Sequence, residues 1–157
     1  MGKTLGKTLI IGYGNTLRQD DGVGYGMAET VAEWGLPGVT CRSVHQLTPD
    51  LALLLVEVEQ VIFIDVFRWQ GEPGDRPSYR VEPVAVGGTR NPVGHSCNPR
   101  SILALGRSLF GATCTATWLL IPGQDFGFGE TLSPLTIAAQ AEALAYLNAI
   151  LIPDAPS

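Results

Sequence analysis

The chain has 157 residues, of which 45% are hydrophobic, and a formal net charge of -5. This length and apolar content exclude a disordered chain and predict one globular domain over residues 1–157. The negative charge and the absence of a Lys/Arg cluster argue against nucleic-acid binding, which needs a positive surface. No apolar run reaches the ~20 residues of a membrane span. Three cysteines without a Cys-x-x-Cys spacing are typical of a reducing compartment. We therefore expect a cytoplasmic protein that contacts neither nucleic acid nor membranes.

Five short apolar runs rich in β-branched residues are predicted to form strands. They lie at about 8–12, 39–44, 61–66, 78–83 and 116–121. Most of them are separated by helical patterns, and this alternation implies parallel strands covered on both faces. We therefore expect an α/β fold, a single-domain three-layer αβα sandwich around a mostly parallel, twisted sheet of about five strands.

The helices are predicted from their starting residues. Asp20 or Asp21 can cap a helix whose apolar face carries Val23, Met27, Val31 and Trp34. Later helices should start where a capping residue precedes a proline, at Thr48-Pro49, Asn98-Pro99 and Ser133-Pro134. The last helix, at about 134–151, is predicted to bury one stripe made of Ile137, Ala141, Leu144 and Leu151.

The first strand ends in a glycine-rich turn, which is followed by two adjacent carboxylates, Asp20 and Asp21. Open α/β sheets bind ligands at the carboxyl ends of their strands, so this crossover puts acidic groups where chemistry usually occurs. Either aspartate could instead cap the following helix. Because consecutive residues do not share a helix face, one can cap while the other points elsewhere.

Asp65 and His95 follow later strands. Asp65 ends the apolar run 61–64, where an unpaired buried charge is costly, so it either caps the next loop or faces the crevice of Asp21. We favour the crevice. His95 precedes the helix at Asn98 and is either a surface residue or a ligand. Asp21, Asp65 and His95 together could offer two oxygens and one imidazole nitrogen to a divalent metal.

Other familiar chemistries are not supported by the sequence. A dinucleotide fingerprint starting at Gly12 would need a third glycine at position 17, which is Leu. There is no His-Glu-x-x-His and no Gly-x-Ser-x-Gly. Cys97 lies only two residues from His95 in one loop, which makes a poor nucleophile–base pair. His45 could simply orient the helix start at Thr48.

Together, these motifs resemble those of the hydrogenase maturation endopeptidases over nearly the whole chain. Three segments carry the resemblance: Gly12-x-Gly14-Asn15-x-Leu17-x-x-Asp20-Asp21-Gly22-x-Gly24, Ile62-Phe63-Ile64-Asp65 and Gly94-His95-Ser96. The segment His45-Gln46-Leu47-Thr48-Pro49 resembles the subgroup that serves bidirectional, NAD-linked nickel–iron hydrogenases.

This family removes a short C-terminal extension from the hydrogenase large-subunit precursor after nickel insertion. The resemblance implies that Asp21, Asp65 and His95 are catalytic and sense nickel supplied by the substrate, with no permanently bound cofactor. We further expect substrate contacts from Asn15, His45 and Thr48. The resemblance also implies a monomer that meets its precursor transiently. Many members carry Glu in place of Asp21, which leaves the choice between Asp20 and Asp21 open.

Two alternative functions use the same residues. A peptidyl-tRNA-hydrolase-like esterase also combines a Gly-x-Gly-Asn strand end with a His and an Asp, although an acidic protein is poorly suited to tRNA. A non-enzymatic assembly factor for a metalloenzyme subunit would bind the same partner without cleaving it.

Overall fold

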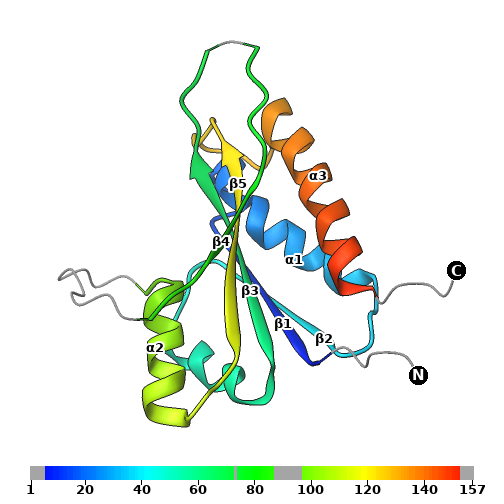
Figure 1. Cartoon of the computed structure of the whole chain (residues 1–157). Helices are drawn as coiled ribbons and strands as arrows, with labels where there is room; N and C mark the ends of the chain where they lie inside the picture. The colour runs from blue at the N-terminus through cyan, green and yellow to red at the C-terminus, as the bar shows by residue number, and fades with distance from the viewer. Residues whose placement is uncertain (1–5, 73, 87–96, 153–157) are drawn as a thin grey trace, which may run out of the picture.

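The computed structural model describes residues 6–72, 74–86 and 97–152. Its centre is a twisted five-stranded sheet with the strand order β2-β1-β3-β5-β4 (Figure 1). The strands are β1 (Thr8–Tyr13), β2 (Val39–Val44), β3 (Gln60–Arg68), β4 (Arg80–Pro83) and β5 (Thr115–Gly123). All neighbouring pairs are parallel except β4 with β5, which is antiparallel at one edge. The predicted mostly parallel sheet of five strands is confirmed.

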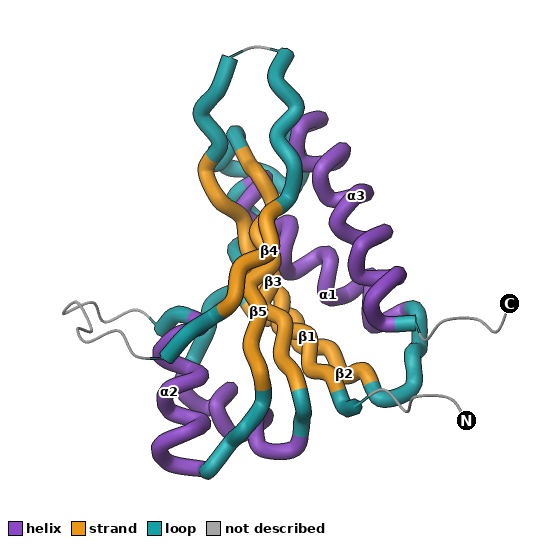
Figure 2. The backbone as a smooth tube through the Cα atoms, viewed as in Figure 1, coloured by secondary structure: helices purple, strands orange, loops and turns teal. Residues whose placement is uncertain are grey.

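Helical segments cover both faces of the sheet, which confirms the three layers (Figure 2). One face is covered by α1 (Val23–Glu33) and α3 (Pro134–Leu151), and the other by α2 (Pro99–Phe110) and the 3-10 segment η2 (Pro49–Glu57). A short 3-10 segment, η1 (Gln19–Gly22), leads into α1. Among the described residues, no helix combines the length and apolar character that crossing a bilayer requires.

Alternate residues of each strand enter two separate cores, as the pleat of a strand requires. Leu9 and Phe63 pack with η2 and α2, whereas Ile10 and Ile64 pack with α1 and α3. All four side chains are at most 2% exposed. Burial on both faces explains why the central strands read as continuous apolar runs in the sequence.

Two glycines of the N-terminal motif let α1 lie directly on the sheet. A Cβ atom on Gly12 would collide with the carbonyl oxygen of Gly24, and a Cβ on Gly24 would collide with the carbonyl oxygens of Ile64 and Tyr13. Neither collision involves a flexible side chain that could move away. The motif therefore fixes how closely the start of α1 approaches the carboxyl ends of β1 and β3.

The predicted helix starts are partly confirmed. Asn98 forms a reciprocal capping box with Ser101, and the Ser133 hydroxyl accepts a hydrogen bond from the backbone N–H of Thr136 at 3.3 Å. Thr48 makes no side-chain cap, and the segment it precedes is a 3-10 helix. The prediction that Asp20 or Asp21 caps α1 is wrong, because Gly22 occupies the cap position and both aspartates lie in η1.

The apolar faces of α1 and α3 differ in how well the sequence predicted them. On α1, the residues Val23, Met27 and Val31 are buried and Trp34 packs against them, as expected. On α3, the predicted stripe is partly right: Leu151 is buried and Leu144 packs against the core, but Ala141 is exposed and Ile137 is 50% exposed. The buried line is Thr136, Ala139, Ala143, Leu147 and Leu151. Alanines lie all round α3, so hydropathy does not distinguish one side, and small side chains let the helix approach the sheet closely.

Candidate functional site

Asp65 lies on β3 beside the last residue of β1. The sequence predicted Asp65 at the end of this strand. In the structure β3 continues to Arg68, because it pairs with β5 over its whole length. The Asp65 carboxylate shares the sheet face of Phe63, toward α2, and its Oδ1 accepts a hydrogen bond from the backbone N–H of Val66 at 2.7 Å. An aspartate inside a paired strand cannot cap a following loop, so the capping alternative is excluded.

Burial raises the pKa of Asp65 from 3.8 to about 6. The hydrogen bonds from Val66 and from the Tyr13 side chain lower this pKa, whereas the negative charge of Asp21 raises it further. Asp65 is therefore a half-buried carboxylate whose ionised form is poorly stabilised by its surroundings. The contribution from Asp21 places the two acidic groups within electrostatic reach of each other.

Tyr13 and Trp118 complete the surroundings of Asp65, and sequence reasoning missed both. The pKa of Tyr13 is raised, first by burial and then by the charge of Asp65 and a hydrogen bond to it. The indole Nε1 of Trp118 favours the ionised form of Tyr13, but its geometry falls short of a hydrogen bond and it has no partner among the described residues. Both side chains lie on the sheet face of Asp65, which strand alternation reveals only once the register of β1 and β5 against β3 is known.

The two consecutive aspartates have different environments. Asp20 is fully buried, and its carboxylate accepts hydrogen bonds from the backbone N–H groups of Gln124 and Asp125 at 2.9 Å. It also accepts bonds from the Ser133 backbone N–H at 2.7 Å and from the Ser133 hydroxyl at 2.8 Å. Burial alone would raise the pKa of Asp20, but these hydrogen bonds together lower it. Asp20 thus joins η1 to the segment between β5 and α3.

Asp21 is half-buried and much less constrained. Its Oδ2 accepts one hydrogen bond, from the backbone N–H of Asn15 at 2.7 Å. Gly14, at a φ of 144°, brings the turn against the backbone of Asp21, where a Cβ would collide with the Asp21 carbonyl oxygen. The glycine-rich turn therefore positions Asp21, and of the two consecutive acids only Asp21 keeps carboxylate lone pairs available for a ligand.

The three expected substrate-contacting residues lie on separate segments. The Asn15 side chain accepts a hydrogen bond from the Leu17 backbone N–H at 2.9 Å, so its oxygen is used inside the turn. His45 is exposed and stacks on Tyr25 of α1, with ring centroids 5.1 Å apart. Thr48 is half-buried at the start of η2. Within the described part of the chain, no hydrogen bond joins His45 or Thr48 to either acid, so their roles stay predictions.

His95 lies outside the described residues. Within those residues, no group of three His, Cys, Asp or Glu side chains is arranged to hold a metal ion. Asp21 and Asp65 are thus within electrostatic reach of each other, and the third predicted ligand is untested. Cys97, the described residue closest to His95 in sequence, packs against the same core as Tyr13 and Trp118.

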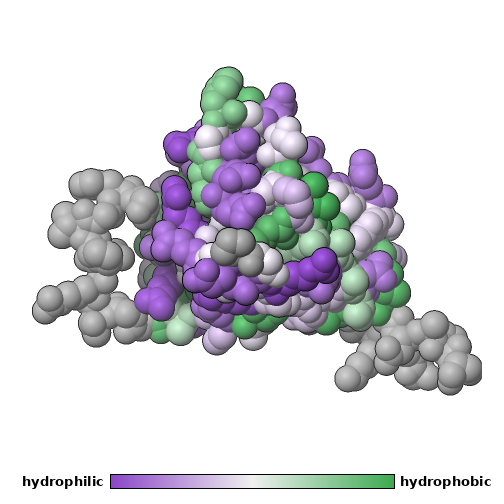
Figure 3. All heavy atoms as spheres, turned by 90° about the horizontal axis from the view of Figure 1, so that it is seen from above, coloured by the Kyte–Doolittle hydropathy of each residue, from purple (hydrophilic) through white to green (hydrophobic). Residues whose placement is uncertain are grey.

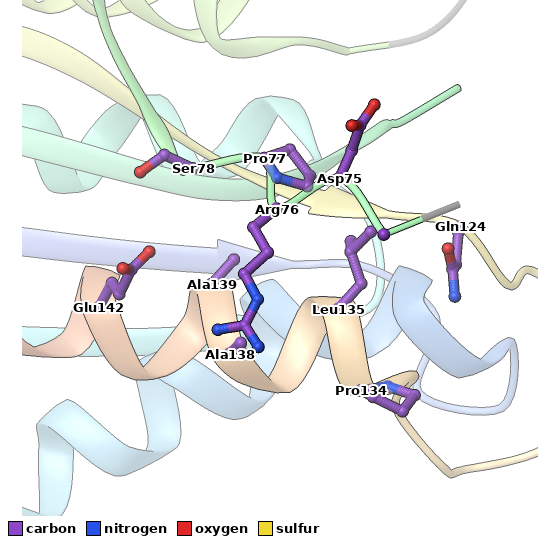
Figure 4. Close-up of a pocket in the computed structure, with 11 residues that line it drawn as sticks. Asp75, Arg76, Pro77, Ser78, Gln124, Pro134, Leu135, Ala138, Ala139 and Glu142 are labelled. Carbon is purple, nitrogen blue, oxygen red and sulfur yellow. The ribbon is translucent and has the colours of Figure 1, made fainter. Parts of the chain in front are cut away.

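A pocket of about 720 Å³ lies away from these acids, between the segment 74–78 and the N-terminal half of α3. Arg76 extends from that segment toward Ala138 (Figure 4). Neither Asp21 nor Asp65 lines this pocket. Seen from the end where the parallel strands finish, the surface is largely hydrophilic with scattered hydrophobic groups (Figure 3).

Comparison with known proteins identifies the fold. No family model and no curated protein matches the chain. Among solved structures, a nickel–iron hydrogenase maturation protease from Thermococcus kodakarensis is 21% identical, with 92% of each chain covered and a TM-score of 0.68. The hydrogenase maturating endopeptidase from E. coli is 16% identical, covering 94% of this chain and 97% of its own, with a TM-score of 0.69. A hydrogenase 2 maturation peptidase from a Thaumarchaeota archaeon is 24% identical, covering 92% of this chain and 97% of its own, with a TM-score of 0.63. The chain therefore has the fold of these maturation peptidases over nearly its whole length.

Proposed function

We propose that this protein is an endopeptidase that removes the C-terminal extension of a nickel-loaded hydrogenase large-subunit precursor. The observation that carries the proposal is the position of Asp65 on β3 beside the last residue of β1, with Asp21 near enough for its charge to raise the Asp65 pKa. Solved proteins of the same fold are maturation peptidases of nickel–iron hydrogenases. The signature at residues 12–24 adds support, because its glycines and Asp20 serve to position Asp21.

The electrostatics of the acidic pair suit a divalent cation. Asp65 is held in a partly buried place where its negative charge is disfavoured, and Asp21 adds repulsion. A cation bound between the two carboxylates would offset both effects at once. In this proposal the cation is the nickel ion of the substrate, held by thiolates of the precursor, and the imidazole of His95 supplies a third contact.

Docking of the nickel ion would place the scissile peptide bond beside the two carboxylates. Water adds to the carbonyl carbon, the C–N bond breaks, and the leaving amine takes up a proton. Either the nickel ion or a carboxylate activates the water, and the ion can also polarise the carbonyl. Asn15, His45 and Thr48 are proposed to contact the precursor. The enzyme itself would hold no permanent metal.

The finer assignments follow from the same proposal. We propose that the protein acts in the cytoplasm as a monomer, and that its substrate belongs to a bidirectional, NAD-linked hydrogenase. Size-exclusion chromatography with light scattering tests the first of these points. Cleavage assays with precursors of different hydrogenase types test the second.

The direct test is to incubate the purified protein with nickel-loaded and nickel-free precursor and to measure the mass of the large subunit. We expect shortening of the nickel-loaded form alone. The variant His95→Ala should lose this activity, whereas Glu33→Gln, which changes an exposed carboxylate at the end of α1, should retain it. Equal cleavage of both precursors would contradict the use of nickel as a recognition feature. Stable binding without shortening would instead support an assembly factor.

A further inference from the structure

The segment between β5 and α3 is tied firmly to the turn that carries Asp21. The Gly129 backbone N–H donates to the carbonyl oxygen of Leu17 at 2.8 Å, and its carbonyl accepts from Gln19 at 2.7 Å. The Arg18 guanidinium donates to the Phe126 carbonyl from Nε at 3.3 Å and from Nη2 at 3.0 Å. These bonds act together with the four that Asp20 accepts. The two segments therefore form one pre-ordered unit.

Two large apolar side chains of this unit are exposed. They come from neighbouring positions of two hydrogen-bonded backbone segments. Phe128 is 89% exposed and Leu17 is 48% exposed. The nearby Phe126, by contrast, is half-buried and lies under the Arg68 guanidinium, 4.3 Å from the ring centroid. Exposing Phe128 gives the fold no burial energy, and holding it on an ordered loop reduces the entropy lost when a partner covers it.

We propose that Leu17 and Phe128 form an apolar anchor for the protein substrate, next to the acidic pair. This inference rests on the proposed function and extends it from the metal contact to the protein contact. The anchor is continuous with the candidate site, because the turn that carries Leu17 also supplies the Asn15 N–H bonded to Asp21. A partner polypeptide that reaches Asp21 can therefore cover Leu17 and Phe128 at the same time.

The size of the anchor favours a transient protein partner over a second copy of this chain. An aromatic side chain buries about 150–250 Å², so the pair supplies far less than the roughly 1,200 Å² of a stable dimer. A small central anchor of one aromatic and one aliphatic side chain is sufficient for a hot spot, in which a few residues carry most of the binding energy. The complementary chemistry on the precursor is a bulky apolar side chain close to the cleaved segment.

The test compares Phe128→Ser and Leu17→Ser with Leu109→Ser as the matched control. Leu109 is 66% exposed in the last turn of α2, at the opposite end of the sheet. With nickel-loaded precursor, Phe128→Ser should raise KM by about tenfold, the scale of losing one anchoring side chain, and change kcat much less. Leu17→Ser should raise KM by a smaller factor, and the control should match wild type. Thermal unfolding of all three variants should also match wild type, because the replaced side chains are exposed.

A KM within twofold of wild type for Phe128→Ser would overturn the anchor while leaving the proposed function standing. Failure of the wild-type protein to cleave any precursor would instead remove the proposed function. Sedimentation provides a second measurement. A wild-type dimer that Phe128→Ser converts to a monomer would show that the surface binds a second copy, and would also overturn the proposal.

Discussion

Asp20 and Asp21 are adjacent in the chain but differ in almost every contact they make. Asp20 is fully buried with four hydrogen bonds to its carboxylate, whereas Asp21 is half-buried with one. The hydrogen bonds lower the pKa of Asp20, whereas Asp65, the acidic neighbour of Asp21, has its pKa raised by burial. A carboxylate with its lone pairs satisfied stabilises the fold, and one without this support is available for chemistry. The same turn thus contains a structural acid beside a candidate functional one.

The largest effect that would sharpen this comparison is expected from Asp20→Ala. The substitution leaves the backbone N–H groups of Gln124, Asp125 and Ser133 without their acceptor, and it removes one of the two acceptors of the Ser133 hydroxyl. We expect a loss of about 3–5 kcal/mol in the free energy of unfolding, measured by urea denaturation at pH 7. Because the folded-state pKa of Asp20 is lowered, this stabilisation is present above the unfolded-state pKa and is lost as the pH falls through the folded-state value. A loss below about 1 kcal/mol would contradict the structural role of Asp20.

The second prediction concerns Asp65→Asn, which should stabilise the protein. The folded-state pKa is about 6 and the ordinary value is 3.8, so the folded state holds the proton more tightly between these values. The destabilising effect of Asp65 is therefore absent below about pH 4, grows as the pH rises to 6 and is constant above it. We expect the variant to gain about 1–3 kcal/mol at pH 8 and nothing at pH 3.5. Equal unfolding free energies of variant and wild type at pH 8 would show that Asp65 is well accommodated.

A smaller effect is expected from Ser133→Ala. The hydroxyl donates to Asp20 at 2.8 Å and caps α3 by accepting from the Thr136 N–H. Its removal should cost about 1–2 kcal/mol in unfolding free energy and leave precursor cleavage intact at temperatures where the variant is folded. Loss of cleavage by the folded variant would mean that the Asp20 contacts also govern catalysis.

The smallest effect on stability is expected from Asp21→Ala. The substitution removes a single acceptor, that of the Asn15 N–H, from a half-buried position. The unfolding free energy should change by about 1 kcal/mol or less, while cleavage of the nickel-loaded precursor is abolished. Near-normal cleavage by the Asp21→Ala variant would show that Asp21 is not part of the active site.

The strands and their order of appearance were readable from the sequence because buried parallel strands are continuous apolar runs bounded by turns. The start of α2 was readable because Asn98 and Pro99 form a local signal that needs no tertiary contact. The buried side of α3 could not be predicted in full, since its alanines give no amphipathic contrast and the contacts with the sheet decide which side packs.

The acidic pair could be placed at one sheet edge because strand direction alone determines that edge. The sequence did not allow a choice between Asp20 and Asp21 as the functional acid. The hydrogen-bond partners of Asp20 are Gln124, Asp125 and Ser133, which are more than 100 positions away in sequence. Tyr13 and Trp118 were overlooked because both resemble ordinary core residues. Their relation to Asp65 depends on the register of β1 and β5 against β3.

The most direct test of the account measures activity and stability of Asp65→Asn on the same preparation. Purified wild-type and variant proteins are incubated with nickel-loaded precursor at pH 8, and the mass of the large subunit is followed alongside thermal unfolding. We predict that the variant unfolds at a higher temperature than wild type and leaves the precursor at full length, while wild type shortens it. Cleavage by the stabilised variant at the wild-type rate would contradict the central claim that Asp65 belongs to the active site.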